Sequence, residues 1–332
     1  MTMITRRRLH RLTQATLLTL AAQAGSMGLM STAHADASPA RIIVGFPAGG
    51  GFDAVARMLA DKLRVELKRP VMVENRPGAG GRLAMETLKA APRDGSVVML
   101  GPEALVSLYP YTMRKLNYDP AKDLTPIGTV SEFPFTFITG TNPAVKSLAE
   151  YVAWAQKNSD KANYGVPARG SQHHFFGILL GKTIGIKMED IPYQGSAPML
   201  VGVMGGQISA GIDVLGSSLE QHRAGKTRVV AVSSPQRVPQ LPDVPTFAEL
   251  GYPDITGMGF NALYAPSGVS KEVVTTWSNA LMKVMADPSV RDQLMQQGSI
   301  PVGKGPEDLA ERGRKAAMRW APIIKESGFV GD

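Results

Sequence analysis

The sequence predicts an α/β fold, because strand-like and helix-like runs alternate along most of the chain. The first unit begins at Arg41, where an apolar run meets three glycines and then apolar residues at helical spacing. Further β-α units continue to Ser233, and residues 271–328 read as three helices with a short extended break near Ile300. The 332 residues exceed one typical core of roughly 100–200 residues, so we expect two structural units.

The elements before residue 140 follow from this periodicity. Apolar residues recur at helical spacing from Val55 to Leu67, and the run VMVEN at residues 71–75 predicts the second strand. The next expected elements are a helix at 82–91, a buried strand at 96–101 and two extended runs at 127–139 around Pro134. We expect the chain to pass from one unit to the other near Pro134.

A capping box, SLAE at residues 147–150, marks the start of the next unit. Ser147 and Glu150 can each accept a hydrogen bond from an otherwise unpaired amide, which predicts a helix through Gln156. The elements expected after it are strands at 162–166, 191–193, 208–213 and 228–233, and helices ending at 180, at 197–204 and at 217–223. A glycine-bearing loop, PARGSQHH at residues 167–174, repeats the opening strand-loop-helix arrangement.

The two glycine loops are the candidate ligand site. Gly49, Gly50 and Gly51 permit positive φ and close backbone approach, and the following helix leaves its first amides unpaired. Such a loop suits a carboxylate or phosphate, although a tight turn without a ligand is the alternative. No Lys-Ser/Thr follows the glycines and the GxGxxG spacing is absent, so nucleotide signatures are excluded. Two such loops allow a ligand to bind at the carboxyl ends of parallel strands.

The first 35 residues have the pattern of an export signal. Arginines at 6–8 and 11 precede a mostly apolar stretch at 15–30, and Ala-His-Ala at 33–35 supplies the small residues that signal peptidase requires. The alternative is a membrane anchor, but Gln23 and Gly25 interrupt a stretch that is short and mildly apolar for a span. We expect a soluble exported protein, with Sec and twin-arginine export both open.

Composition narrows the function classes further. The leader holds four arginines and no acidic residue, so the mature chain keeps 32 basic and 28 acidic residues. These basic residues are scattered, and no nucleic-acid partner is expected. Cysteine is absent, which excludes disulfides, a thiolate nucleophile and a Cys-ligated metal. We expect no cofactor and no metal.

Seven motifs give the chain a resemblance to a known family. They resemble, in order, the successive motifs of the Bug family, the periplasmic solute receptors of tripartite tricarboxylate transporters. The motifs are FPAGGGFDAVAR, PVMVENRPGAGG, KAAPRDGSVVMLG, LNYDPAKDLTPIG, NYGVPARGSQHH, IPYQGSAP and LPDVPTFAELGYP. The match covers essentially the whole mature chain, and several motifs are too long for a chance match.

The resemblance implies a periplasmic-binding-protein type II (Venus flytrap) fold, in which two α/β lobes joined by a hinge close over a ligand. Lobe one would comprise residues 36–137 and 262–332, lobe two residues 138–261, with Phe137 and Ala262 near the hinge strands. The implied partners are a small carboxylate, aromatic or a dicarboxylate, and the membrane subunits of a transporter. The receptor would act in the periplasm as a monomer, and not as an enzyme.

The resemblance also implies which residues bind the ligand, through backbone amides, hydroxyls and bridging water. They are Ala48, Gly49, Gly50, Gly51, Phe52, Asp53, Ala168, Arg169, Gly170, Ser171, His174 and Asp213. Phe52, Arg82 and Arg169 depart from the usual family pattern. Phe52 offers a ring to an aromatic or long apolar ligand or packs on its own lobe. Arg82 and Arg169 offer a charge-assisted contact to a distal carboxylate or point into solvent, and Arg169 is the better candidate.

Several of these residues have a structural alternative. Asp53 could bind an amino group, but capping the helix that it begins is the favoured role. His173 and His174 project about 100° apart on a helix and would not chelate one metal together. We expect Phe176 to pack in the core while His173 and Phe175 line an aromatic wall. Asp213 would repel a carboxylate, so hydrogen bonding between the lobes is its favoured role.

Two other function classes stay open at this point. An exported hydrolase would use Ser171 with His174 at i, i+3 spacing, although the chain has no nucleophile-elbow motif. A receptor that serves a signalling partner instead of a transporter would have the same sequence features.

Overall fold

The computed structural model describes residues 38–140 and 143–331, which belong to one compact unit beginning at Ser38. The expected export signal at residues 1–35 lies outside the described residues. Within the described ranges, no helix is both long enough and apolar enough to cross a membrane.

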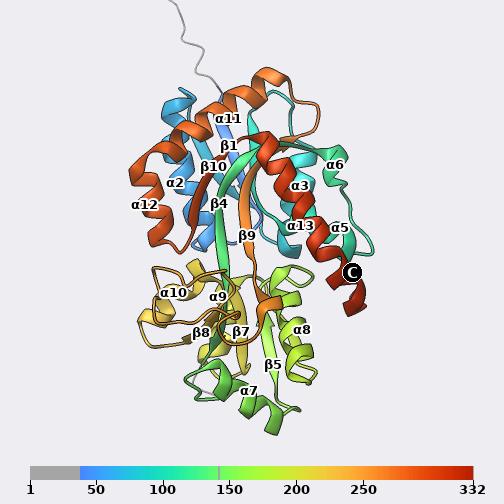
Figure 1. Ribbon diagram of the computed structural model, residues 1–332. Coiled ribbons are helices and arrows are strands. Elements are labelled where there is room, and N and C mark those ends of the chain that lie inside the picture. Colours follow the sequence, from blue (N-terminus) through green and yellow to red (C-terminus); the bar gives the residue numbers. More distant parts are fainter. Residues whose placement is uncertain (1–37, 141–142, 332) are drawn as a thin grey trace, which may run out of the picture. The chain divides into compact units, whose positions relative to one another are not determined.

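Strands and helices alternate as the periodicity predicts (Figure 1). The strands are β1 Ala40–Val44, β2 Val71–Asn75, β3 Val97–Pro102, β4 Leu124–Thr139, β5 Asn163–Val166, β6 Glu189–Pro192, β7 Ala210–Val214, β8 Arg228–Val232, β9 Met258–Pro266 and β10 Ile300–Lys304. The longer helices are α2 Gly51–Glu66, α3 Arg82–Lys89, α7 Leu148–Lys157, α8 Gln172–Ile184, α9 Ser196–Met204, α10 Leu215–Arg223, α11 Lys271–Ala286, α12 Pro288–Gln296 and α13 Pro306–Ser327. Short helical turns are α4 Ala104–Ser107, α5 Tyr109–Thr112, α6 Pro120–Asp123, η1 Ala79–Gly81 and η2 Pro253–Ile255.

The strands form two groups of parallel strands connected by antiparallel ones. β1 pairs in parallel with β2 and β3, and β5 pairs in parallel with β6 and β7. β9 is antiparallel to both β3 and β4, and β4 is antiparallel to β7 and β8. The first glycine loop follows the carboxyl end of β1 and the second follows that of β5, as the sequence predicts.

The strand β4 belongs to both groups. The sequence predicts two extended runs around Pro134, but the structure has one continuous strand of 16 residues. Residues 124–134 pair with β9, and the pairing changes to β7 and β8 at Phe135. Proline has no amide hydrogen to donate, so Pro134 suits the point where the partner strand changes. Pro134 lies opposite Met258, and this pair marks the change of partner more closely than the expected hinge positions Phe137 and Ala262.

The start of α7 and the packing of two phenylalanines were both predicted from the sequence. Ser147 caps α7 by accepting from the Glu150 amide at 3.2 Å, as predicted. The Glu150 carboxylate, however, accepts from the amide of Lys146 and not from that of Ser147. Phe176 packs in the core, as expected, with its ring centroid 5.3 Å from that of Trp320 on α13. Phe175 is equally buried and does not line the cavity described below, so its expected place in an aromatic wall is wrong.

Candidate ligand-binding site

A cavity of about 210 Å³ lies at the carboxyl ends of five strands, β1, β3, β5, β6 and β7. The loops that follow these strands supply most of its lining, and β4 supplies two phenylalanines. The lining residues are Phe46–Phe52, Pro102, Ala104, Tyr109, Phe133, Phe135, Pro167, Ala168, Ser171–His173, Gln194–Pro198, Asp213, Val214 and Ser217.

Four helices begin at this cavity. Gly51 of α2, Gln172 of α8 and Ser196 of α9 are first helical residues that line it, and α10 starts directly after Val214. A helix N-terminus carries a partial positive charge and unpaired amides, so four of them together favour an anion. None of the residues described as lining the cavity is Lys or Arg, so its attraction for anions comes from the backbone.

The first glycine loop differs from the prediction in one respect. Only Gly49 has a positive φ, +82°, whereas Gly50 has φ −84° in the ordinary extended region. The amide of Gly49 donates to Asp53 Oδ2 at 2.9 Å, so it is not free for a ligand. The amides of Gly51 and Phe52, in the first turn of α2, have no intrahelical acceptor and are the donors that remain.

The carboxylate of Asp53 orders this loop and does not line the cavity. Its oxygens accept from the Gly49 amide, from Arg57 Nε at 2.9 Å and from Asn75 Nδ2 at 2.9 Å. Burial opposes its ionisation, but the hydrogen bonds from Arg57, Gly49 and Asn75 outweigh burial and lower the pKa of Asp53. The contacts of Asp53 are structural, but they order the loop before α2 and do not cap an amide of the helix, since Gly49 precedes the N-cap residue Gly50.

In the second glycine loop, Ala168 and Ser171 line the cavity, but Arg169 and Gly170 do not. Arg169 forms an ion pair with Asp190, with Nε 2.6 Å from Oδ2, and its guanidinium lies 5.4 Å from the ring centre of Phe329. The expectation that Arg169 contacts a ligand carboxylate is not supported by this position, because its fork already binds Asp190. Gly170 supplies the positive φ of the loop, +79°.

The histidine that lines the cavity is His173, and His174 lies elsewhere. His174 Nε2 is 3.5 Å from Asp190 Oδ1 and its ring packs against Phe329 at 4.4 Å. Because adjacent helical residues project about 100° apart, only one of the two can face the cavity. The sequence placed His174 among the ligand-binding residues and His173 in an aromatic wall. His173 lines the cavity as expected, whereas His174 does not.

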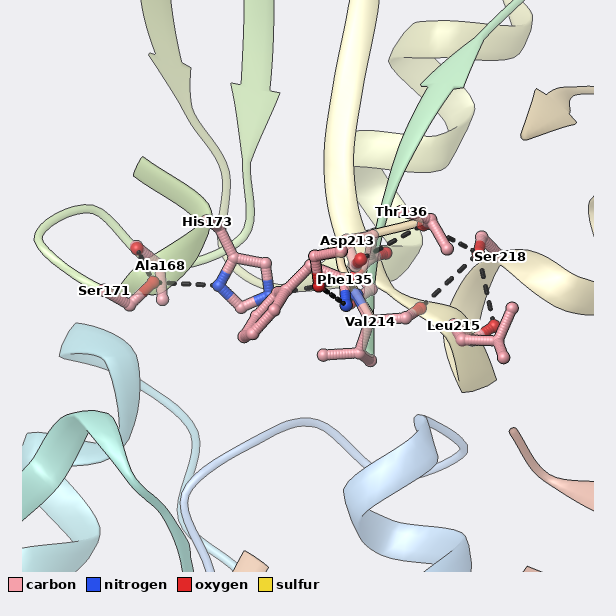
Figure 2. A network of polar contacts seen from close by, with 11 residues as sticks. Phe135, Thr136, Ala168, Ser171, His173, Asp213, Val214, Leu215 and Ser218 are labelled. Atoms are coloured by element: carbon pink, nitrogen blue, oxygen red, sulfur yellow. Dashed lines mark hydrogen bonds and ion pairs between the residues drawn. The ribbon is translucent and has the colours of Figure 1, made fainter. Parts of the chain in front are cut away.

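A line of hydrogen bonds fixes the ring of His173 (Figure 2). Ser171 Oγ donates to the carbonyl oxygen of Ala168 at 2.6 Å and lies 2.9 Å from His173 Nδ1. The edge of the His173 ring meets the ring of Phe135 at 4.8 Å between centroids. Burial disfavours the charged imidazolium and lowers the pKa of His173 to about 3, so the ring is neutral at physiological pH.

Asp213 is the penultimate residue of β7 and is fully buried. Its Oδ1 accepts from Ser196 Oγ at 2.7 Å and from the Val214 amide at 2.8 Å. Burial raises the pKa of Asp213 to about 7, although the hydrogen bonds from Ser196 and Val214 oppose this shift. The sequence favoured a hydrogen bond between the lobes, but both partners lie within residues 138–261, the range expected for lobe two.

Five rings run along the cavity wall. Phe46 and Phe52 stack with centroids 4.5 Å apart, Phe52 meets Phe133 at 6.2 Å, and Phe133 meets Phe135 at 5.5 Å. His173 completes the line at 4.8 Å from Phe135. Phe52 packs on Phe46, one of the two roles expected for it, and it also lines the cavity.

A third loop of the site, Gln194–Pro198, was not among the predicted ligand loops. This loop belongs to the motif IPYQGSAP, and its glycine, Gly195, has φ +100° directly before α9. A glycine between a strand-like run and a helix is the same signal that identified the other two loops. Arg82, singled out in the sequence, does not line this cavity, and its Nε donates to the carbonyl of Ala79 at 3.0 Å.

Comparison with known proteins identifies the family. The sequence profile of the tripartite tricarboxylate transporter family receptors, TctC, matches residues 55–329. The chain belongs to this family. It is 31% identical to protein BugT of Bordetella pertussis over 305 residues, which cover 91% of this chain and 94% of BugT. TctC receptors are periplasmic solute-binding proteins and not enzymes.

Solved structures of TctC receptors have the same fold. The periplasmic binding protein BugD aligns with a TM-score of 0.83 at 31% identity, over 89% of this chain and 99% of BugD. An R. palustris protein with adipate aligns with a TM-score of 0.85 at 28% identity, over 89% of this chain and 99% of that one. MatC from Rhodopseudomonas palustris, with bound malate, aligns with a TM-score of 0.81 at 26% identity, over 87% and 99%. The predicted periplasmic-binding-protein fold is thereby confirmed.

Proposed function

We propose that this TctC receptor captures a small aromatic carboxylate in the periplasm and delivers it to the membrane subunits of a tripartite tricarboxylate transporter. The observation that carries the ligand class is the meeting of four helix N-termini at one cavity. Free amides at such ends bind a carboxylate without a cationic side chain. The line of rings from Phe46 to His173 favours a flat, apolar body attached to that carboxylate.

The charges around the cavity favour a single carboxylate. A second carboxylate would need its own donors or a cation, and the described lining residues include no Lys or Arg. Arg169, the expected partner of a distal carboxylate, is paired with Asp190. The buried carboxyl of Asp213 would repel a second negative charge when it is ionised, and when it is neutral it offers only one hydrogen.

The lobes and the export signal are part of the same proposal. Lobe one is residues 36–137 and 262–332, lobe two is residues 138–261, and residues 1–35 are removed on export. Close approaches across the cavity support binding by both lobes. A Cβ placed on Gly51 would lie 3.7 Å from Ser217 Oγ, and one placed on Gly195 would lie 3.6 Å from Pro47. A ligand held at Gly51 is therefore within reach of residues from α10.

An aliphatic dicarboxylate is the second candidate ligand. It is favoured by the structures of two related proteins, one with adipate and one with malate. In this chain an aliphatic dicarboxylate would have to place its second carboxylate beside Asp213 or beside the line of rings from Phe46 to His173. The two candidates differ in charge and shape, so one panel of ligands separates them.

Thermal unfolding of the mature chain with a ligand panel tests the proposal. The panel comprises benzoate, phenylacetate, adipate, malate and aspartate, with benzylamine and benzyl alcohol as controls for charge. A ligand at 100 times its Kd stabilises the protein by roughly 2.7 kcal/mol. We expect the largest rise in Tm with an aromatic carboxylate and none with benzylamine. A larger rise with adipate or malate would establish the dicarboxylate, and tight binding of aspartate would contradict both the aromatic preference and the role of Asp213.

A further inference from the structure

Three lining residues of the cavity, Gln172, His173 and Asp213, have a buried polar atom without a hydrogen-bond partner, and the last two of these atoms belong to side chains that approach each other. These two atoms are Nε2 of His173 and Oδ2 of Asp213. Nε2 lies 4.0 Å from the other oxygen of the same carboxyl, Oδ1, which is too far for a direct hydrogen bond. Leaving two such groups unpaired in a buried site is costly, so a ligand group that satisfies both would be strongly selected.

The hydrogen bonds around His173 decide which of its nitrogens carries the proton. Ser171 Oγ has a single hydrogen, and its short contact with the carbonyl of Ala168 uses that hydrogen. The remaining contact, between Ser171 Oγ and His173 Nδ1, therefore needs the hydrogen on Nδ1. In the neutral ring Nε2 then has only a lone pair, and it requires a donor from the ligand.

The hydrogen bonds around Asp213 decide the position of its proton in the neutral acid. Oδ1 already accepts from Ser196 Oγ and from the Val214 amide, so the proton of the neutral acid resides on Oδ2. Burial favours this neutral form, and a ligand carboxylate in the same cavity favours it further. With the ligand bound, Oδ2–H is therefore a donor that requires an acceptor.

We infer that the ligand is a hydroxylated carboxylate whose hydroxyl donates to His173 Nε2 and accepts from Asp213 Oδ2–H. A hydroxyl is the smallest group that is donor and acceptor at once, and it satisfies both atoms. This inference rests on the proposed function and specifies its ligand. The carboxylate binds at the helix N-termini, the body lies along the rings, and the hydroxyl reaches the pair formed by His173 and Asp213.

A carboxylate, an ammonium and a methoxy group each satisfy only one member of the pair. A second carboxylate accepts hydrogen bonds but cannot donate one to Nε2. An ammonium donates but cannot accept from Oδ2–H, and it would bind only by driving Asp213 to ionise. A methoxy group likewise accepts from Oδ2–H and leaves Nε2 unpaired. The preference for a hydroxyl is therefore a measurable signature of both protonation states.

Isothermal titration with matched pairs of ligands tests this inference. Benzoate is compared with 2-, 3- and 4-hydroxybenzoate, with the corresponding methoxybenzoates and with 4-(aminomethyl)benzoate. Hexanoate and 6-hydroxyhexanoate form an aliphatic pair, so that the test does not depend on the aromatic body. We expect one hydroxy isomer to bind about tenfold more tightly than its parent, and its methoxy analogue to lose that gain.

Variants locate the effect. His173→Phe keeps an aromatic ring beside Phe135 but removes Nε2. The gain in affinity that the ligand hydroxyl provides over the parent carboxylate should therefore fall to about onefold, while the parent carboxylates still bind. Asp213→Asn places an amide donor at the Oδ2 position and retains the gain. His222→Asn is the matched control, because His222 bonds the Val229 amide and does not line the cavity.

The outcomes separate this inference from the proposed function. Binding of benzoate without any hydroxyl gain, in both the aromatic and aliphatic pairs, overturns the inference and leaves the function standing. A hydroxyl gain that survives His173→Phe also overturns it. Stronger binding of the aminomethyl ligand would show an ionised Asp213 and an amino ligand instead. Binding by none of the carboxylates overturns the function itself, and the inference with it.

Discussion

His173 Nε2 lies 4.0 Å from Asp213 Oδ1, at the end of a line that begins at Ser171 Oγ. A serine, a histidine and an aspartate follow one another along this line, as in a Ser-His-Asp hydrolase, but their hydrogen bonding and protonation differ. The hydrogen of Ser171 is donated to the carbonyl of Ala168, and burial lowers the pKa of His173 to about 3, which makes the ring a weak base. The alternative pair, Ser171 with His174, is also wrong, because Ser171 bonds His173. The arrangement fits a receptor that presents fixed polar atoms to a ligand.

The shape of the first glycine loop can be tested with two alanine substitutions. Gly49→Ala forces a side chain into positive φ at a cost of about 1–2 kcal/mol, and we expect at least a tenfold loss of benzoate affinity. Gly50→Ala is the matched control, because φ is ordinary there and the new Cβ meets only Pro47 O at 3.5 Å. Titration calorimetry measures both. Equal losses in the two variants would show that the backbone conformation of Gly49 is not what binding requires.

The carboxylate of Asp53 should hold this loop in place at neutral pH. Asp53→Asn weakens three hydrogen bonds, and we expect a loss of roughly 1–3 kcal/mol in the free energy of unfolding. The pKa of Asp53 is below its usual 3.8, so its contribution is complete above about pH 4 and is lost as the pH falls through the folded-state value. Urea unfolding between pH 3 and 7 measures this. Asp61→Asn, at an exposed pair with Arg64, is the control and should show almost no effect.

Asp213 should make the protein less stable as the pH rises. Its pKa of about 7 lies above the usual 3.8, so between about pH 4 and 7 the folded state keeps a proton that the unfolded chain has released. Asp213→Asn removes this dependence, and its stability relative to the native protein should increase by on the order of 1–4 kcal/mol from pH 4.5 to 7.5. Glu103→Gln should show the same sign, since burial also raises the pKa of Glu103 to about 7. If the difference in unfolding free energy between each variant and the native protein did not change with pH, burial would not be raising these two pKa values.

Arg169 should contribute little to ligand affinity. Because its guanidinium binds Asp190 outside the cavity, Arg169→Ala should change the affinity for benzoate and adipate by less than about twofold. Arg237→Ala removes a comparable exposed ion pair, with Glu249, and is the control for a general loss of stability. A loss confined to adipate would restore Arg169 as the partner of a second carboxylate.

Ligand-driven closure is expected if the two lobes rotate about the strands at Pro134 and Met258. Only a few positions need to absorb such a rotation, and β4 changes its partner after Pro134 where β9 begins at Met258. Small-angle scattering should show a smaller radius of gyration at a saturating concentration of the ligand found by thermal unfolding. An unchanged profile at proven saturation would count against closure while leaving binding intact.

The sequence by itself determined the order of most elements and two of the three glycine loops, but its periodicity did not predict β9. Hydrophobic period and capping residues are local signals, and they placed β2, α7 and the helices after Lys271 correctly. The loops at Gly49 and Gly170 were found because glycine before a helix needs no knowledge of the rest of the chain. The third loop, at Gly195, carries the same signal and could have been found in the same way.

Only the tertiary structure decided which side chains reach the cavity. That His173 and not His174 faces the cavity depends on the rotation of α8 about its axis. Contacts of the two rings with Phe135 and Phe329, from distant parts of the chain, fix this rotation. Arg169 does not line the cavity, because its guanidinium forms an ion pair with Asp190 on the later strand β6. The protonation states of His173 and Asp213 could not be predicted from the sequence either. Their pKa values follow from burial, which no local sequence pattern indicates.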